Sequence, residues 1–515
     1  MLSWESYLMK EVQLVEEALN AKLKGKRTKR PLVLAAVMLA MFMGAIEATI
    51  VSTAMPAIVG ELGGFSLYSW VFSSYLLMNS VTVLIYGKLA DLFGRKPVLL
   101  FGLTVFMTGS ILCGFAESMH MLIVFRLIQG FGAGAVMPIA TTIVGDIYNT
   151  EERAKVQGYL SSVWGISAVM GPAIGGFLVE YVSWHYVFWV NIPLGILSMA
   201  GLWFFLHEKV VKKKHEIDYP GAILITIGIS SLMYILVEGG HRFSWTSLPA
   251  FLFFSISMAA IVLFVLQERR AAEPMMPFSI WKEKSIFIAN IVSLTTGVML
   301  IGISSFLPAF VQGVMEQSPI VAGFALTAMS IGWPIASAFS GRLALAKGYR
   351  FTSLLGGVFL VAGGAIFATM TPEAGPIWAA GGSFMTGAGM GLTSTAFILL
   401  IQGTVGWQQR GIATASNMFM RNLGNTIGAA LLGGILNSRF VSYLEKNGTS
   451  SGEGPTLETA NTLLDAKERA TLPAETKSLL QEGLTASLHT VYLGVLIFAV
   501  LSIILISFLP RKKSS

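Results

Sequence analysis

The chain has 515 residues, of which 54% are hydrophobic and 12% charged, and its mean hydropathy is +0.69. Soluble globular domains carry about 25% charged residues, so the composition excludes an ordinary soluble protein and predicts a polytopic membrane protein. The net charge of +7 would fit nucleic acid, but in a membrane protein it more often reflects topology. The single cysteine, Cys113, lies in an apolar run and excludes a disulfide framework or a cysteine metal cluster.

The N-terminal segment, residues 1–31, is polar and ends in the basic cluster KLKGKRTKR directly before the first apolar run. This pattern does not predict a signal peptide. Apolar residues recur every three or four positions, which predicts an amphipathic helix on the cytoplasmic membrane surface. A solvated leader explains the pattern equally well, and we assign the segment no role.

Apolar runs long enough to cross a bilayer recur along almost the whole chain. Charges and turn residues delimit fourteen predicted spans, at about 32–55, 68–88, 97–116, 120–144, 156–180, 186–207, 219–237, 248–267, 286–312, 321–341, 351–371, 376–402, 411–436 and 488–509. Lys and Arg concentrate in the loops on the side that holds both termini, whereas the opposite short loops contain only Arg242. Both termini are therefore predicted to be cytoplasmic.

The spans predict five segments. After the N-terminal segment come a six-helix bundle at 32–207, two inserted helices with their flanking loops at 208–285, and a second six-helix bundle at 286–509, with a short cytoplasmic tail at 510–515. The second bundle includes a long loop at 437–487, predicted to be extracellular and to combine a flexible stretch with a short surface helix.

Two stretches at equivalent places in the halves resemble each other. GKLADLFGRK at 87–96 follows the second span, and GRLALAKGYR at 341–350 follows the tenth with the same Gly-x-Leu-x4-Gly spacing but without the acid at Asp91. Two homologous halves with two spans inserted between them account for this layout.

The first copy, with Gly87, Asp91, Gly94, Arg95 and Lys96, matches the general signature of the major facilitator superfamily. From about residue 30 the chain resembles the 14-span drug:proton antiporter branch of that superfamily. The resemblance implies an all-α fold of two six-helix bundles plus two inserted helices, which rock about a midplane site. In the loop, Asp91 can pair with Arg95 or with a neighbouring helix end and lock one conformation; a plain loop salt bridge is the alternative.

The fourth span contains VFRLIQGFGAGA, with Arg126 about one turn inside the membrane and Gln129 one turn further. The small residues that follow favour close helix packing rather than a dinucleotide loop, which requires a preceding strand. The resemblance implies a role for Arg126 in proton coupling. A structural, hydrogen-bonding arginine is the alternative.

The fifth span contains WGISAVMGPAIGG, which resembles the signature held mainly by antiporters of the superfamily, at Gly165, Gly171, Pro172, Gly175 and Gly176. A proline flanked by glycines bends a helix and lets a neighbour slide against it. This favours export over uptake, and ordinary small-residue packing is the alternative. The SWHYVFWVNIPLG stretch that follows resembles the branch's entry to the sixth span, and we interpret its aromatic residues as interfacial and structural.

Three ionisable residues lie well inside the predicted spans: Glu47, Arg126 and Arg421. Such residues usually face the bundle interior and mark a transport pathway. Arg421, in the thirteenth span, has three open interpretations: a structural anchor, a coupling partner or a charge in the cavity.

Glu47 falls where the branch has an acid in the first span, with Glu in place of Asp and Ser52 in place of Asn. Burial favours a protonated carboxyl and a nearby cation favours the ionised form, so one site can exchange a proton for a cationic ligand. Proton entry supplies about 1.4 kcal/mol per pH unit and about 2.3 kcal/mol per charge per 100 mV, which suffices for uphill export. A protonated glutamate hydrogen-bonded across helices is the alternative.

We therefore expect a proton-coupled antiporter that exports lipophilic, often cationic, drugs across the bacterial cytoplasmic membrane. We expect it to act as a monomer, without cofactor, metal or nucleic acid. The alternatives are export of a lipid, peptide, siderophore or single antibiotic, and proton-driven uptake. An enzyme is disfavoured because the histidines show no paired metal spacing and no Walker motif occurs. The loop signature and the proline-containing fifth span disfavour a membrane scaffold or sensor.

Overall fold

The computed structural model describes residues 28–148, 150–208, 218–240, 242–271, 276, 278–406, 410–447 and 459–510. Within these ranges the regular structure is helical, apart from an isolated bridge between Gly239 and Phe243, which confirms the all-α prediction. The amphipathic N-terminal helix, the flexible start of the long loop and nearly all of the C-terminal tail were predicted for residues outside the described ones.

Each predicted span has a helical counterpart. The long helices are α2 (Arg30–Leu62), α3 (Tyr68–Phe93), α4 (Arg95–Cys113), α5 (Met119–Ile147), α6 (Thr150–Tyr181), α8 (Asn191–Phe205), α9 (Tyr219–Glu238), α10 (Leu248–Arg270), α11 (Lys284–Ala309), α12 (Pro319–Lys347), α13 (Tyr349–Ala368), α14 (Gly375–Thr404), α15 (Arg410–Asn447) and α18 (Ala474–Ser507). Short helices are α7 (His185–Trp189), α16 (Ala460–Leu464) and α17 (Ala466–Thr471), and η3 (Phe310–Val314) continues α11. Among the described residues, 13 helices are long and apolar enough to cross a membrane, and α6 adds a shorter apolar stretch, Gly165–Tyr181.

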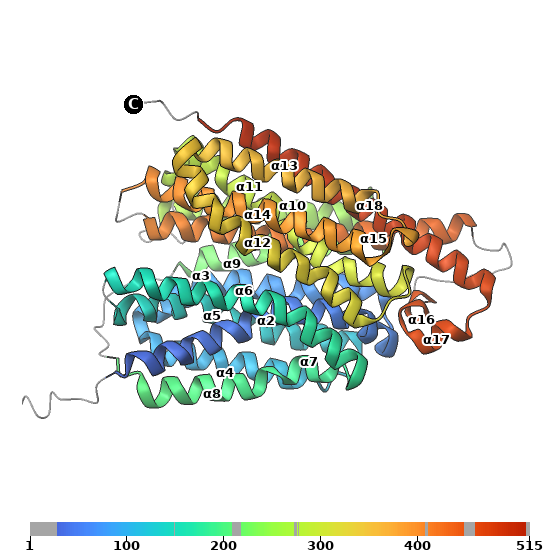
Figure 1. Cartoon of the computed structure of the whole chain (residues 1–515), viewed down its shortest axis with the longest axis horizontal. Coiled ribbons are helices and arrows are strands. Elements are labelled where there is room, and N and C mark those ends of the chain that lie inside the picture. The colour runs from blue at the N-terminus through green and yellow to red at the C-terminus, as the bar shows by residue number, and fades with distance from the viewer. Residues whose placement is uncertain are drawn as a thin grey trace, which may run out of the picture.

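The long helices form two groups. The group from α2 to α8 lies below the group from α11 to α15 and α18 in Figure 1. The two remaining helices stay together, because α10 packs on α9 and α9 contacts both α3 and α15. The inserted pair therefore lies against the boundary between the two groups.

Several helices continue past the predicted apolar runs. The long loop was expected at 437–487, but α15 extends to Asn447 and α18 begins at Ala474. Similarly, most of the 87–96 motif belongs to α3, and the chain turns only at Gly94, with φ of 94°. Polar residues with good helix propensity extend a helix beyond the hydrocarbon, and hydropathy does not detect that extension.

The two groups contact each other from the middle of α3 and α15 toward one end. We call this the loop end, where α2 finishes at Leu62 and α12 begins at Pro319. The opposite end, where α3 meets α4 and α12 meets α13, we call the basic end. The contacts include Ser80 Oγ with Thr426 Oγ1 (3.1 Å), the Tyr68 hydroxyl donating to the Ser305 carbonyl (2.6 Å), and Asn437 Nδ2 donating to the Ser66 carbonyl (2.7 Å).

Short helices of the long loop reinforce the contact at the loop end, to the right in Figure 1. In α16, Asn461 Oδ1 accepts a hydrogen bond from the Phe65 amide (3.0 Å). In α17, Arg469 donates to the Gln312 carbonyl (2.8 Å), and the Gln312 side chain donates to the Thr53 carbonyl (3.2 Å). Residues 460–471 thus join the ends of both helix groups.

Glycines bring α4 and α5 unusually close. A Cβ added to Gly132 would lie 2.3 Å from the Phe106 amide nitrogen and 2.5 Å from the Gly102 carbonyl oxygen. Backbone atoms cannot move aside as a flexible side chain can, so this helix pair requires glycine there.

We expect Gly132→Ala to destabilise the protein by about 1–3 kcal/mol, the usual cost of overpacking, with a lower melting temperature in detergent. Gly381→Ala in α14 is the matched control, since a Cβ there meets nothing within 4 Å and alanine favours helix. Equal melting temperatures for the two variants would contradict the close approach of α4 and α5.

Candidate functional site

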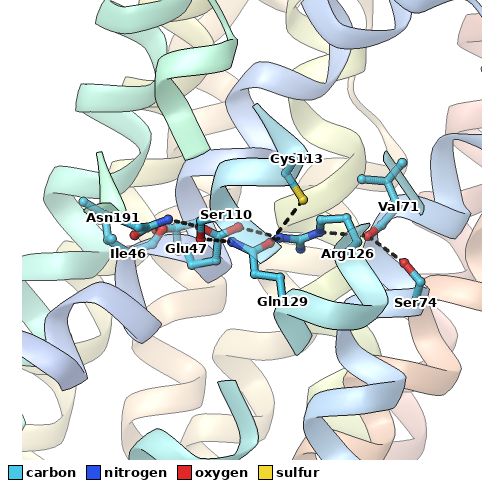
Figure 2. A network of polar contacts seen from close by, with 10 residues as sticks. Ile46, Glu47, Val71, Ser74, Ser110, Cys113, Arg126, Gln129 and Asn191 are labelled. Atoms are coloured by element: carbon cyan, nitrogen blue, oxygen red, sulfur yellow. Dashed lines mark hydrogen bonds and ion pairs between the residues drawn. The ribbon is translucent and has the colours of Figure 1, made fainter. Parts of the chain in front are cut away.

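A buried ion pair occupies the interior of the first helix group. Glu47 Oε1 in α2 accepts a hydrogen bond from Arg126 in α5, and the two side chains are 0% and 2% exposed. The other carboxylate oxygen, Oε2, accepts from Asn191 Nδ2 at 2.6 Å. Figure 2 shows these side chains converging between the helices. Both oxygens of Glu47 therefore have a donor supplied by the protein.

The charge of Arg126 is stabilised from several sides. Its guanidinium donates to Gln129 Oε1 (2.6 Å), and its Nε donates to the Val71 carbonyl (3.2 Å). The guanidinium carbon also lies 4.1 Å from the centre of the Tyr75 ring, within cation–π range. A buried charge needs such partners, because water cannot solvate it.

The network extends from α5 to α4 through Gln129. Its Nε2 donates to Ser110 Oγ at 2.7 Å, and its Oε1 accepts a weak bond from Cys113 Sγ at 3.8 Å. Cβ atoms on Gly109 and Gly130 would meet the backbones of Gln129 and Tyr75 at 2.5 and 2.4 Å. These glycines let the neighbouring helices approach closely enough to form the network.

Local sequence signals fix the helices that carry the pair. Proline near its first turn starts α2 at Arg30, where proline's missing N–H is not needed. The Ser118 hydroxyl caps α5 by accepting from the Met121 amide. Arg126 and Gln129 are three residues apart and so share one helix face.

Sequence reasoning identified Glu47, Arg126 and Gln129, and the structure brings all three together. It missed Asn191 and Ser110, which hold the carboxylate and the amide. Asn191 stands in the Trp-x-x-x-Phe-x-x-Asn pattern that begins at Trp184, and this pattern was interpreted only through its aromatic residues. A polar residue at the start of a span was the available signal.

The antiporter-like motif lies in α6, between α2 and the second helix group. Cβ atoms on Gly171 and Gly175 would meet the hydroxyls of Thr49 and Thr53 in α2, at 2.0 and 2.2 Å. One residue on, a Cβ added to Gly176 would lie 2.8 Å from the Ile320 backbone in α12. A Cβ added to Gly323 in α12 would lie 2.3 Å from the Pro172 carbonyl oxygen. Gly165 meets nothing within 4 Å, so the close contacts come from the second half of the motif.

The loop motif lies at the basic end. The amides of Arg95 and Lys96, in the first turn of α4, each donate to the Glu208 carboxylate at 2.9 Å. Arg95 Nε also lies 3.1 Å from Asp146 Oδ2 at the end of α5. An acid at a helix N-terminus is favoured by the helix dipole, and sequence reasoning missed Glu208. Gly87 and Asp91 lie within α3.

Arg421 lies apart from this network, in α15 of the second helix group. Its guanidinium carbon lies 5.8 Å from the centre of the Trp333 ring. No cluster of histidine, cysteine and acidic residues within the described ranges fits a metal ion.

Comparison with known proteins agrees with this architecture. A sequence profile of the Major Facilitator Superfamily matches residues 37–429. The chain belongs to the Major Facilitator Superfamily. It is a multi-pass transporter of the cell membrane and not an enzyme.

Two relatives are named for multidrug resistance or multidrug transport. The chain is 33% identical over 494 residues to Multidrug resistance protein 3 of Bacillus subtilis (strain 168), covering 95% of this chain and 96% of that protein. It is 34% identical over 417 residues to Multidrug transporter protein MdtP of the same strain, covering 81% and 77%. A bacterial homologue of the human lysosomal transporter Spinster, solved in an inward-facing and occupied conformation, shares the fold with a TM-score of 0.63 at 16% identity, covering 94% of this chain and 98% of that one.

We expect Glu47→Ala to lower the stability of the purified protein by about 3–5 kcal/mol, because it leaves the Arg126 charge buried without its counter-ion. Replacing both residues, Glu47→Ala with Arg126→Met, should cost less than the sum of the two single changes. Denaturation in detergent measures the stability of the parent, the two single variants and the double variant. Glu373→Ala, at an exposed position, is the control. Strict additivity would show that the two charges do not interact.

Proposed function

We propose that this protein is a proton-coupled antiporter that exports lipophilic, often cationic, drugs by alternating access. The observation that carries the proposal is the buried Glu47 carboxylate, ion-paired to Arg126, in a chain similar to two multidrug transporters. Ionisable residues away from water in a membrane protein are costly and mark a pathway for protons or substrates.

The hydrogen bonds of Glu47 support a specific role for the proton. Arg126 and Asn191 already occupy both oxygens of Glu47, so the cation that a proton displaces in this conformation is Arg126 itself. Protonated Glu47 no longer compensates the Arg126 charge, which then needs another partner or water. A cationic substrate acts through this arginine instead of replacing it on the carboxylate.

Helix α6 offers a path from the ion pair to the second helix group. Gly171 packs against α2 beside the Ile46 carbonyl, 3.3 Å from its added Cβ and one residue before Glu47. Gly176 packs against α12. A rearrangement of α2 after protonation therefore reaches the contact between the two groups through α6. The glycine surfaces on α6 allow the packed helices to slide against each other.

The contacts between the groups suit one of the two states of alternating access. They hold the loop end closed, through Tyr68, Asn437 and α16. We propose that this conformation opens toward the basic end, and that the opposite state requires these contacts to break.

The first test of this proposal is transport in everted membrane vesicles. The parent protein should accumulate ethidium and release protons when substrate is added. Glu47→Gln should lose proton release and should also lose the accumulation that the proton gradient drives. For one exchanged proton, this accumulation is about tenfold per pH unit of gradient. The proposal fails if Glu47→Gln matches the parent in both respects, or if the parent moves no cationic or neutral drug. Glu373→Gln, which is exposed, should behave as the parent.

The second test concerns alternating access. Ser80 Oγ and Thr426 Oγ1 lie 3.1 Å apart on α3 and α15, so Ser80→Cys with Thr426→Cys should form a disulfide under oxidation. We expect dye accumulation to stop in the oxidised double variant and to return after reduction. Each single variant, treated identically, should remain active. Undiminished transport with the cross-link formed would rule out separation of the two helices at this point.

A further inference from the structure

A small cavity opens within the second helix group. Its volume is about 60 Å³, and it lies among α11, α12, α14 and α15. Its polar or aromatic lining includes Ser293, Thr296, Trp333, Thr393, Ser394 and Arg421. Three of these helices also contact the first helix group: α11 contacts α2, α12 contacts α6, and α15 contacts α3. The cavity therefore belongs to the part of the second group that faces the boundary between the groups.

Arg421 brings an uncompensated charge to this cavity. Within the described part of the chain its guanidinium forms no ion pair or hydrogen bond, and its interaction is the cation–π contact with Trp333. That contact supplies no hydrogen-bond acceptor for a group with five N–H donors. Arg126, in contrast, has a carboxylate, an amide oxygen and a backbone carbonyl.

Around Arg421, the cavity lining supplies a hydrogen-bond donor and apolar walls but no acidic side chain. The Ser394 hydroxyl also makes no hydrogen bond among the described residues, and it lines the same space. Met390 and Met418 add flexible thioether walls, and Met418 is 42% exposed. The one described carboxylate deep within the two groups, Glu47, is occupied by Arg126 and Asn191. The cavity is thus positive and lacks a protein counter-ion.

We propose that Arg421 and this cavity bind the acidic head of a lipophilic carboxylic acid, so that the exported compounds include such acids as well as cations. An arginine fork binds a carboxylate with two parallel hydrogen bonds, and Ser394 supplies a further donor. A single water needs about 10–15 Å³, so the cavity holds a carboxylate group. Drug-sized ligands need about 300–1,000 Å³, so the apolar body extends from the cavity toward the boundary between the groups.

This inference rests on the proposed export function for its substrate class, but its first test does not require transport. The probe is dansyl-labelled undecanoic acid, and its methyl ester is the neutral control. Binding is followed by dansyl fluorescence with the purified full-length protein in dodecyl maltoside. The parent should bind the acid at least about tenfold more tightly than the ester, since hydrogen bonds to charged groups contribute that much.

Variants assign the preference to the guanidinium. Arg421→Gln should abolish the preference for the acid while ester binding persists, which also shows that the variant is folded. Arg421→Lys should keep part of the preference, because it retains the charge but not the fork. Arg439→Gln, at an exposed position on the same helix, should match the parent. Equal affinity of the parent for acid and ester, or an unchanged preference in Arg421→Gln, would overturn the inference.

A second experiment distinguishes an exported acid from an anionic membrane lipid, which offers a similar head. Everted vesicles with the parent should accumulate the dansyl acid, and vesicles with Arg421→Gln should not. If the parent fails to accumulate the acid, and phosphatidylglycerol but not phosphatidylcholine displaces it from purified protein, the cavity is a lipid site and the inference is wrong. Failure of ethidium transport by the parent, in contrast, would count against the proposed drug export and leave the binding result standing.

Discussion

The ion pair between Glu47 and Arg126 is the interaction on which the first helix group depends. Two charges away from water are tolerated only when nearly every donor and acceptor is satisfied. Satisfying them requires α2, α3, α4, α5 and α8 to converge on one point. The glycines at 109 and 130 follow from this requirement, since any larger residue would hold α4 or α3 away from α5.

Helix α6 connects this local chemistry to the large-scale contact between the groups. It shares one glycine surface with α2 and another with α12 within a single turn, at Gly175 and Gly176. A proline-containing helix in that position can bend where the two surfaces meet. The motif that favoured export in the sequence therefore has a physical location, between the Glu47–Arg126 ion pair and the boundary between the two helix groups.

The sequence predicted the charged members of the site and missed the neutral ones, for a physical reason. Glu47 and Arg126 stand out because an ionisable residue in an apolar run is costly and rarely accidental. Asn191 and Ser110 do not stand out, since uncharged polar residues are common in spans and only tertiary packing shows which of them face a charge. The same limit applies to α15 and α18, whose outer turns are helical but polar. Hydropathy identified where the chain crosses the membrane and gave no information about where the helices stop.

Arg126 and Arg421 place opposite demands on a substrate. Glu47 and Arg126 together carry no net charge, whereas Arg421 has no compensating acid among the described residues, so the two interiors together carry one positive charge. A proton on Glu47 raises that charge by one and increases the repulsion that an entering cation meets. The same proton strengthens the attraction for an acidic head near Arg421. Protonation of Glu47 therefore opposes the binding of cations and favours the binding of anions. On electrostatic grounds, exchange of a proton for a drug is favoured only when the drug is a cation. An acid held at Arg421 must be released by a change of cavity shape, since protonation of Glu47 alone would hold it more tightly.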